Sequence, residues 1–261
     1  MKIISWNINS VRLRAPIVLR IAVETDADII CLQETKCPDE AFPYKTFQKA
    51  GYEHIHVHGM KSYNGQAVLS KLPFESHEVY HRCGKQDCRH IEVNVAGLQI
   101  HNLYIPAGGD EPNPEINEKY KHKLQFVDEM TDWFHEKRSK NDAVIALGDF
   151  NIAPHEHDVW SSRQLVNVVS HTAPERERIL KMQQSLNFID AAREFVPLNE
   201  KSYSWWSYRN KDWKKSDRGR RLDHIWITQP LKPRLKSYKV FSHARDWEKP
   251  SDHAPIMIEL D

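Results

Sequence analysis

Several short segments of the chain are apolar at every position instead of at alternate positions. The clearest are Ile29 to Leu32 and Val144 to Leu147. A strand with one buried face alternates, whereas a strand that is apolar throughout is expected where both faces are covered. The sequence therefore predicts sheets that carry packed protein on both sides, and helices must supply part of that cover.

The remaining periodicity agrees with this arrangement. Eight segments have the apolar, β-branched composition of strands: Ile3 to Ile8, Ala27 to Leu32, Gln66 to Leu69, Ile91 to Val95, Leu98 to Ile105, Ala143 to Leu147, Leu222 to Ile227 and Pro255 to Leu260. A helix is expected from Glu115 to Lys137, where an apolar stripe runs through Ile116, Tyr120, Leu124, Val127, Met130 and Phe134. Weaker helical signals cover Ala15 to Thr25, Phe42 to Ala50 and Arg176 to Leu186, and loops are expected over Pro106 to Pro114 and Trp205 to Gly219.

The order of these elements favours an α/β fold, a four-layer α/β sandwich in which two packed mixed β-sheets are flanked by helices. Single sandwiches of about 200 to 250 residues are common. The 261 residues contain no repeat, low-complexity tract or linker. We therefore expect one catalytic domain over residues 1–261.

Composition excludes some classes of protein. No apolar run approaches the ~20 residues that cross a bilayer, and the first residues lack the core of a secretory signal. We expect a cytoplasmic protein whose four cysteines stay reduced. The net charge of +1 does not indicate a polyanionic partner. Residues 209–221, however, hold seven basic and two acidic residues beside Trp205 and Trp206. Such a run is usually a solvated loop, but interleaved aromatic residues suit nucleic acid.

Polar side chains stand at the ends of five predicted strands: Asn7, Glu34, the pair Asp149 and Asn151, Asp223, and the pair Asp252 and His253. Each alone could be a turn or capping residue. Together they can converge above a rigid sheet, where pre-organised sites are built. Carboxylate and amide oxygens favour a hard cation such as Mg²⁺, which leans on substrate phosphate. The pattern predicts metal-assisted chemistry on a phosphate ester.

The motifs around these residues resemble the exonuclease III type of apurinic/apyrimidinic endonuclease, within the endonuclease, exonuclease and phosphatase superfamily. The resemblance spans nearly the whole chain. It rests on Ser5 to Arg12, Leu32 to Lys36, Asn102 to Pro106, Gly148 to Pro154, Arg221 to His224 and Lys249 to Pro255.

The resemblance implies roles for the individual residues. Glu34 would bind the metal directly, with Asn7 and Asp252 close to the ion or its waters; Mg²⁺ is expected, and Mn²⁺ can substitute. Asp149 would orient and deprotonate the attacking water. Asn151 would fix that water or Asp149, Tyr104 would donate to the phosphate, and His253, held by Asp223, would face the charge that develops on phosphorus. The identity of the general base and the number of metal ions stay open.

The resemblance also implies the substrate. Trp205, Trp206 and Leu222 would enclose a small apolar pocket for a base-free sugar, with Arg89 and Arg209 at the DNA. A pocket too small for a base selects abasic sites, whose extrusion costs less. Read without the resemblance, these tryptophans fit a core or a solvated lid equally well.

These inferences favour a monomeric DNA-repair hydrolase that acts on double-stranded DNA, 5′ of abasic sites and at blocked 3′ ends, with 3′-5′ exonuclease activity. The balance between these activities stays open. The alternatives are a lipid or small-molecule phosphatase of the same superfamily, and a nucleic-acid-binding module without activity. The apolar and basic residues near Trp205 argue against the first, and the complete polar set argues against the second.

One segment has no counterpart in the resemblance. Between His81 and His90, Cys83 and Cys88 lie on either side of an expected turn at a spacing that zinc could accept. Two thiols packed across a hairpin are the favoured interpretation. Cys31 is expected in the core and Cys37 in a loop.

Overall fold

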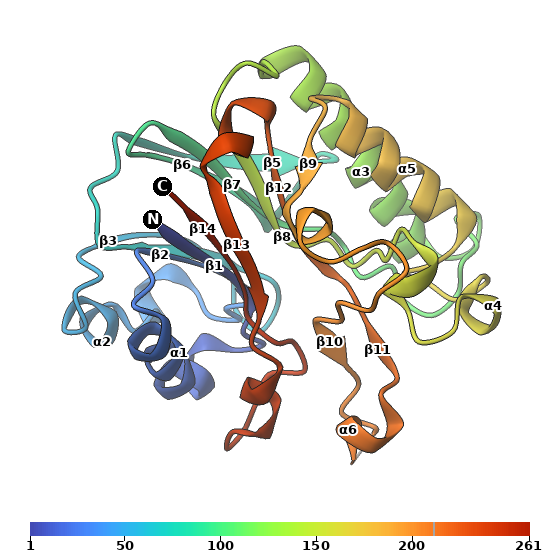
Figure 1. Cartoon of the computed structure of the whole chain (residues 1–261), viewed down its shortest axis with the longest axis horizontal. Coiled ribbons are helices and arrows are strands. Elements are labelled where there is room, and N and C mark those ends of the chain that lie inside the picture. The colour runs from blue at the N-terminus through green and yellow to red at the C-terminus, as the bar shows by residue number, and fades with distance from the viewer. Residues whose placement is uncertain (211) are drawn as a thin grey trace.

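The computed structural model describes residues 1–210 and 212–261. Two six-stranded mixed sheets face each other near the centre of the molecule (Figure 1). The first has the strand order β13 (Leu235–Val240), β14 (Ile256–Leu260), β1 (Lys2–Asn7), β2 (Ile29–Gln33), β4 (Gln66–Ser70), β3 (His54–His58). The second has the order β5 (Ser76–Arg82), β6 (Lys85–Val95), β7 (Leu98–Tyr104), β8 (Val144–Asp149), β12 (Asp223–Ile227), β9 (Ile189–Asp190).

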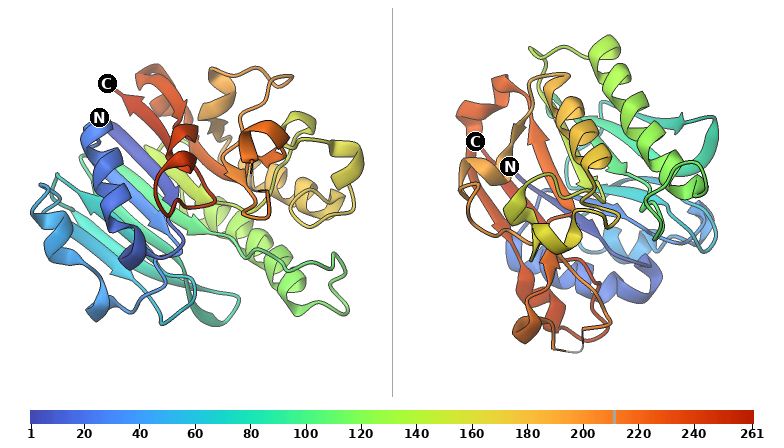
Figure 2. Two further views of the ribbon diagram at one scale, coloured as in Figure 1. Left: turned by 90° about the horizontal axis from the view of Figure 1, so that it is seen from below. Right: turned by 90° about the vertical axis from the view of Figure 1, so that its right-hand side faces the viewer.

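Helices cover the outer faces of both sheets, as Figure 2 shows. The first sheet is covered by α1 (Val11–Thr25) and α2 (Tyr44–Gln48), and the second by α3 (Glu118–Lys137) and α5 (Ala173–Gln184). The shorter helices are α4 (Ser162–Leu165), α6 (Trp213–Ser216), η1 (Asp39–Ala41), η2 (Glu156–Asp158), η3 (Ala191–Glu194), η4 (Gln229–Arg234) and η5 (Ser242–Asp246). No helix in the described ranges is both long and apolar enough to cross a membrane.

The uninterrupted apolar strands are buried on both faces. In β2, Ile29 and Cys31 point between the sheets, whereas Ile30 and Leu32 join the cluster under α1. In β8, residues 145 and 147 likewise point inward, and residues 144 and 146 pack against α3. The expected four-layer sandwich and the core position of Cys31 are therefore confirmed.

Strand direction brings the polar ends together. β1 and β2 are parallel, as are β7 and β8, so these four strands finish in pairs. β12 runs antiparallel to β8 with Asp223 opposite Asp149, and β14 runs antiparallel to β1. Gly148 is required just before the end of β8: its φ is 139°, and an added Cβ would lie 1.9 Å from the Leu103 carbonyl oxygen.

The structure also corrects some sequence predictions. The strands β3, β5 and β13 were not predicted, because these edge strands carry polar and half-exposed residues in place of an apolar run. Ile116 lies outside α3 and is 74% exposed, since the Asn117 side chain caps the helix by accepting from the Lys119 and Tyr120 amides. The expected loop from Trp205 to Gly219 contains β10 (Trp205–Trp206), α6 and the first residue of β11 (Gly219–Arg220). Together they form a hairpin that projects from one end of the molecule (Figure 1).

Candidate active site

Asn7 lies at the centre of the strand-end polar groups and is fully buried at the end of β1. Its Nδ2 atom donates to Glu34 Oε1 at 2.9 Å and to Asp149 Oδ2 at 2.8 Å. One amide therefore joins the ends of β1, β2 and β8. We call Asn7, Glu34, Tyr104, Asp149, Asn151, Asp223 and His253 the strand-end cluster.

Glu34 is prepared to remain a carboxylate. Burial raises its pKa, but the Lys36 ammonium, 2.7 Å from Oε2, and the hydrogen bond from Asn7 act against burial, so the net shift is downward. The Tyr104 hydroxyl, which donates to Oε1 at 2.7 Å, adds to this effect. Burial and the same carboxylate raise the pKa of Tyr104, so the phenol keeps its proton. The backbone of Glu34 has a φ of 51°, a conformation that is rarely adopted by residues other than glycine.

His253 is held between two carboxylates. Its Nδ1 atom lies 2.8 Å from Asp223 Oδ2, and its Nε2 atom lies 3.6 Å from Asp149 Oδ2. Burial lowers the pKa of His253, but Asp223 and then Asp149 outweigh burial and raise it to about 10. The ring is therefore an imidazolium near neutral pH. Ser204 Oγ donates to the same Asp223 oxygen at 2.6 Å and fixes that carboxylate.

The pKa of Asp149 is raised, in contrast to that of the Glu34 carboxylate. Burial raises its pKa to about 7; the His253 imidazolium opposes this rise, and the Asp223 carboxylate adds to it. Asn151 steadies the carboxylate, because its backbone N–H donates to Oδ1 at 2.9 Å and its Nδ2 donates to Oδ2 at 3.2 Å. A carboxylate with a pKa near neutrality can accept a proton from water, which is what a general base requires.

Asp252 is separated from this cluster by Asn9. Its Oδ1 accepts from Asn9 Nδ2 at 3.0 Å and its Oδ2 from Trp205 Nε1 at 3.0 Å. Asn9 also accepts from Lys36 Nζ at 2.7 Å. Sequence reasoning assigned no role to Asn9, Lys36 or Ser204, although the first two lie within the motifs that carried the resemblance. Their positions two residues after Asn7 and Glu34 were the available signal.

A cavity of about 500 Å³ opens beside the cluster, and its lining includes Glu34, Asn151, Asp252 and His253. We call the other lining residues the cavity wall: Ala107, Gly109, Asp110, Val168, Val169, Ser170, Trp205, Ser207, Arg209, Arg220 and Leu222. Trp205, Leu222 and Arg209 lie at the cavity; the sequence had suggested a pocket for the first two and a DNA contact for Arg209. Val168, Val169 and Arg220 were not foreseen, because their segments carry no recognisable motif.

Two predicted DNA-contact residues lie elsewhere. Trp206 is 4% exposed and packs against Tyr203, Ala254 and Trp213, so it belongs to the core beneath the hairpin and not to the cavity. The reason is strand alternation, which turns neighbouring residues of β10 to opposite faces. Arg89 does not line the cavity; its guanidinium lies over the Tyr104 ring at 4.8 Å and donates to the Tyr104 carbonyl at 3.2 Å.

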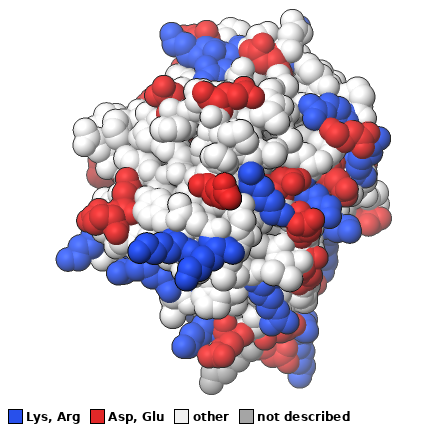
Figure 3. Space-filling view, turned by 90° about the vertical axis from the view of Figure 1, so that its left-hand side faces the viewer, with Lys and Arg blue, Asp and Glu red and all other residues white. Residues whose placement is uncertain are grey.

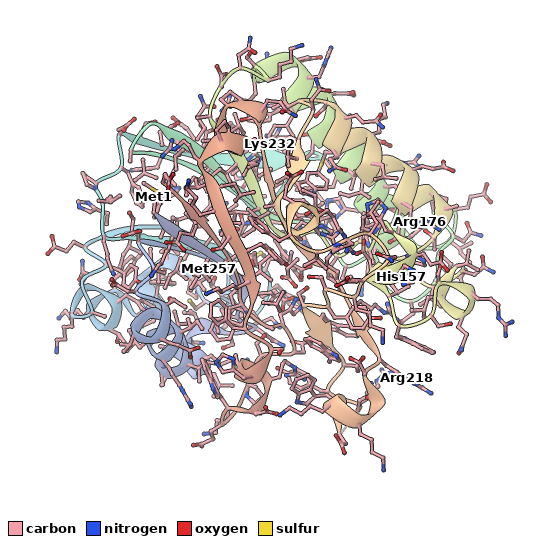
Figure 4. The ribbon with its side chains drawn as sticks, viewed as in Figure 1. Met1, His157, Arg176, Arg218, Lys232 and Met257 are labelled. Carbon is pink, nitrogen blue, oxygen red and sulfur yellow. The ribbon has the colours of Figure 1, made fainter. Side chains whose placement is uncertain are left out.

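Only some of the basic side chains in residues 209–221 are available for contact with a ligand. Arg218 lies on the projecting hairpin, far from Met1 and Lys232 in the view of Figure 4. Lys214 pairs with Asp246 at 2.6 Å, and Arg220 is directed into the cavity wall. Lys211 lies outside the described residues. On the face that Figure 3 presents, a group of basic side chains gathers at the lower left, while basic and acidic side chains are mixed elsewhere.

The donor set fits a hard cation. Within the described residues, the side chains of Asp149, Asp223 and His253 offer three ligand atoms lying within 4.8 Å of one another. A protonated imidazolium cannot ligate, however, and His253 is already bonded to Asp223. Glu34 is the better anchor, since it remains charged and borders the open cavity. The oxygen atoms of Glu34, Asn7 and Asp149 are of the kind that Mg²⁺ prefers.

The cysteine hairpin does not gather four ligands. His90 Nδ1 contacts Arg82 and its Nε2 contacts His101, whereas the His81 ring packs near His58. Cys83 packs toward α3, while Cys88 is buried. Both thiols are free. Cys37 lies in a loop, as expected, but is fully buried.

Comparisons with known proteins agree with this geometry. The sequence model of the Endonuclease/Exonuclease/phosphatase family matches residues 4–253. The exodeoxyribonuclease III of Haemophilus influenzae is 30% identical, with 100% of both chains covered. An AP endonuclease from Archaeoglobus fulgidus is 32% identical and superimposes with a TM-score of 0.93 over 100% of this chain and 99% of the other. The 3′ phosphatase NExo from Neisseria, bound to a product DNA hairpin, is 29% identical with a TM-score of 0.91, over 100% and 99% of the two chains.

Proposed function

The chain belongs to the Endonuclease/Exonuclease/phosphatase family, and we propose that it is a DNA-repair phosphodiesterase that uses Mg²⁺. Its substrates would be double-stranded DNA with abasic sites, cut on the 5′ side, and DNA with blocked 3′ ends. The single observation that carries this proposal is the paired state of Asp149 and His253. A carboxylate with a pKa of about 7 faces an imidazolium with a pKa of about 10, beside a cavity.

Each partner of this pair suits one requirement of phosphodiester hydrolysis. Water must lose a proton as it attacks, and Asp149 can accept it above a pH of about 7. Negative charge grows on the non-bridging oxygens, where the His253 imidazolium and the Tyr104 phenol can donate hydrogen bonds. Asp223 keeps the imidazole charged and oriented through the bond to Nδ1.

Magnesium would be held by Glu34 and Asn7, with Asp149 close by, and Mn²⁺ would substitute for it. When bound, the ion would withdraw charge from a phosphoryl oxygen. Asn7 also has two roles within the protein. Its Nδ2 fixes Glu34 and Asp149, and its Oδ1 accepts a hydrogen bond from the Asn9 backbone amide at 3.1 Å. Asp252 would act indirectly, through its hydrogen bonds with the side chains of Asn9 and Trp205.

The cavity supports the choice of substrate. Trp205, Leu222 and Val169 give its wall apolar bulk, which suits a base-free sugar or a 3′ terminus. Arg209 and Arg220 on the same wall can meet a neighbouring phosphate. Because every proposed residue comes from one chain, the site requires no second copy, and we expect a monomer to be active.

The proposal is tested by offering the purified protein three labelled duplexes: one with a single abasic analogue, one with a 3′-phosphate and one intact. We expect Mg²⁺-dependent incision next to the abasic analogue that leaves a 3′-hydroxyl, and release of phosphate from the blocked end. A Glu34→Ala protein serves as the control for contaminating nucleases. Absence of Mg²⁺-dependent cleavage in a folded wild-type protein would refute the proposal.

A further inference from the structure

A fully buried ion pair lies beneath the candidate active site. Lys123 of α3 and Glu175 of α5 are both 0% exposed, and Lys123 Nζ lies 2.5 Å from Glu175 Oε1. Desolvation largely cancels the attraction within such pairs, and apolar residues of similar volume often stabilise a protein as well or better. The pair therefore calls for an explanation other than stability.

The ammonium group of Lys123 uses its other donors on two backbone carbonyls. It donates to the carbonyl of Asn151 at 2.8 Å and to that of Ala107 at 3.2 Å. An ammonium has three donors, and with Glu175 all three have partners. Asn151 is the residue whose side chain and N–H hold Asp149, and its φ of 53° lies in the left-handed region, which asparagine adopts more readily than most residues. Lys123 thus holds in place the turn that carries the proposed general base.

Glu175 holds another segment beside the cavity, the loop at Ser170. Its carboxylate accepts from the Ser170 amide at 2.9 Å, from the Thr172 amide at 3.0 Å and from the Thr172 hydroxyl at 2.7 Å. Ser170 itself lines the cavity and has a φ of 90°. Its carbonyl accepts from the Ala153 amide at 2.8 Å, which returns to the turn after Asp149. Both charges are therefore bonded to backbone that borders the site.

The aliphatic part of the Lys123 side chain is packed tightly between the loops that border the cavity. An added Cβ at Gly108 would lie 2.9 Å from Lys123 Cδ and 3.0 Å from Val169 Cγ1. The 107–110 loop, the turn at Asn151 and the 168–170 loop thus meet around one side chain. Each of these segments contributes residues that line the cavity.

From this arrangement we propose that Lys123 and Glu175 are positioning residues, which set the distance between the general base and the cavity wall. The inference rests on the proposed function and deepens it, because it identifies what fixes the sugar-binding space relative to Asp149. The two residues do not touch substrate. Their effect is exerted through Asn151 on one side and through Ser170 on the other.

The test is the double variant Lys123→Met/Glu175→Gln, compared with Lys123→Met alone. The single variant leaves a buried carboxylate without its partner and should lower Tm strongly. The double variant removes both charges and should recover part of that loss. We expect its kcat on the abasic duplex to stay on the order of tenfold to a hundredfold below wild type, because small misplacements of catalytic groups have effects of this size. We expect KM to change less.

Binding measured without metal gives a second readout. In EDTA, fluorescence anisotropy should show a smaller preference for abasic over intact duplex in the double variant than in wild type. The matched control is Arg178→Met/Asp128→Asn, which removes a half-exposed pair at 3.0 Å between the same two helices. This control should keep the wild-type kcat and the wild-type preference.

A recovered Tm together with wild-type kcat and wild-type binding preference would overturn the inference. If the double variant does not fold, Glu175→Gln alone decides. It replaces one acceptor oxygen by a donor facing the Ser170 and Thr172 amides, so a folded protein with unchanged binding preference would also overturn the inference. Failure of the proposed function is distinguishable, since wild-type protein would then neither cut the abasic duplex nor prefer it.

Discussion

The strand-end cluster and the cavity wall are adjacent but differently built. The cluster consists of side chains at the ends of buried strands, joined mainly by side-chain hydrogen bonds such as those from Asn7 to Glu34 and Asp149. The wall consists of loops and the base of the β10–β11 hairpin. Its loops are held by hydrogen bonds from their backbone amides to buried side chains, such as the carboxylate of Glu175. A side-chain hydrogen bond from Trp205 Nε1 joins the wall to Asp252 Oδ2, and Asp252 borders the same cavity as the cluster.

This difference suggests a division of labour. A cluster fixed by two sheets presents the same charges to any phosphodiester, because every nucleotide offers the same phosphate. A wall of loops can differ in shape without disturbing the strand ends. We therefore expect mutations in the cluster to lower the rate on all substrates and mutations in the wall to change the choice among them.

The largest effect is expected in the cluster. Glu34→Ala should remove most Mg²⁺-dependent turnover, and Asp149→Asn should be at least as damaging, since an amide cannot accept a proton from water. General acid–base groups typically contribute about 10² to 10⁴-fold, so losses of at least that order are expected in single-turnover assays. Far-ultraviolet circular dichroism and duplex binding should stay close to wild type. Near-normal cleavage by Glu34→Ala at saturating Mg²⁺ would remove that residue from the metal site.

The next largest effect concerns the pair Asp223 and His253. Each alanine variant disables the same imidazolium, so the two losses should be non-additive in a double-mutant cycle of kcat/KM. Strictly additive losses would mean that Asp223 acts elsewhere.

The pair also predicts a pH dependence. Activity requires deprotonated Asp149 and protonated His253, so the rate should rise through a pH of about 7 and fall through about 10. Asp223→Asn removes the carboxylate that raises the pKa of His253, so the alkaline limb should move to lower pH. His253 also links stability to pH: its contribution is complete below its unfolded pKa of about 6.5 and is lost as pH rises through about 10. An alkaline limb that is unchanged in Asp223→Asn would contradict this assignment.

A smaller effect on rate but a clearer one on choice is expected in the wall. Trp205→Ala should lower the ratio of abasic to intact-site cleavage, because the lost bulk admits other nucleotides. Trp205→Phe is the informative control, since it removes the hydrogen bond to Asp252 but keeps a smaller apolar ring. Leu222→Ala should act in the same direction as Trp205→Ala. Unchanged ratios in both alanine variants would place selectivity in DNA bending or in the loop around Arg89.

The smallest effect is expected at the β5–β6 hairpin. Cys88→Ser should leave kcat and metal dependence unchanged, because the thiol is buried away from the cavity and its neighbours there do not form a four-ligand set. Metal analysis of protein purified without added metal provides the check. Stoichiometric zinc that is lost, together with stability, in Cys88→Ser would reverse this interpretation.

The sequence predicted the cluster better than the wall, for a physical reason. Cluster residues such as Asn7 and Asp149 follow buried strands, and a buried strand leaves a plain apolar signal that fixes where its end lies. The loops 107–110 and 168–170 are placed by contacts with Lys123 and with Glu175 respectively, and these two residues look like ordinary charged positions of surface helices. Burial of those charges arises from long-range packing and cannot be read from local periodicity.

The errors have the same origin. Trp206 was assigned to the cavity with Trp205, but adjacent residues of a strand face opposite sides, and this short strand was predicted as a loop. The edge strand β3 was missed because its histidines interrupt the apolar pattern. In each case local composition was read correctly, and pairing with a distant segment decided the outcome.

The division of labour is tested most directly by one ratio, measured at a single salt concentration because backbone affinity depends steeply on ionic strength. The ratio is kcat/KM for an abasic duplex divided by kcat/KM for the intact duplex, in wild type, Glu34→Ala and Leu222→Ala. We expect Glu34→Ala to lower both rates and leave their ratio near the wild-type value, and Leu222→Ala to lower the ratio while preserving most of the rate on intact DNA. A ratio that collapses in Glu34→Ala, or one that survives in Leu222→Ala, would contradict the account.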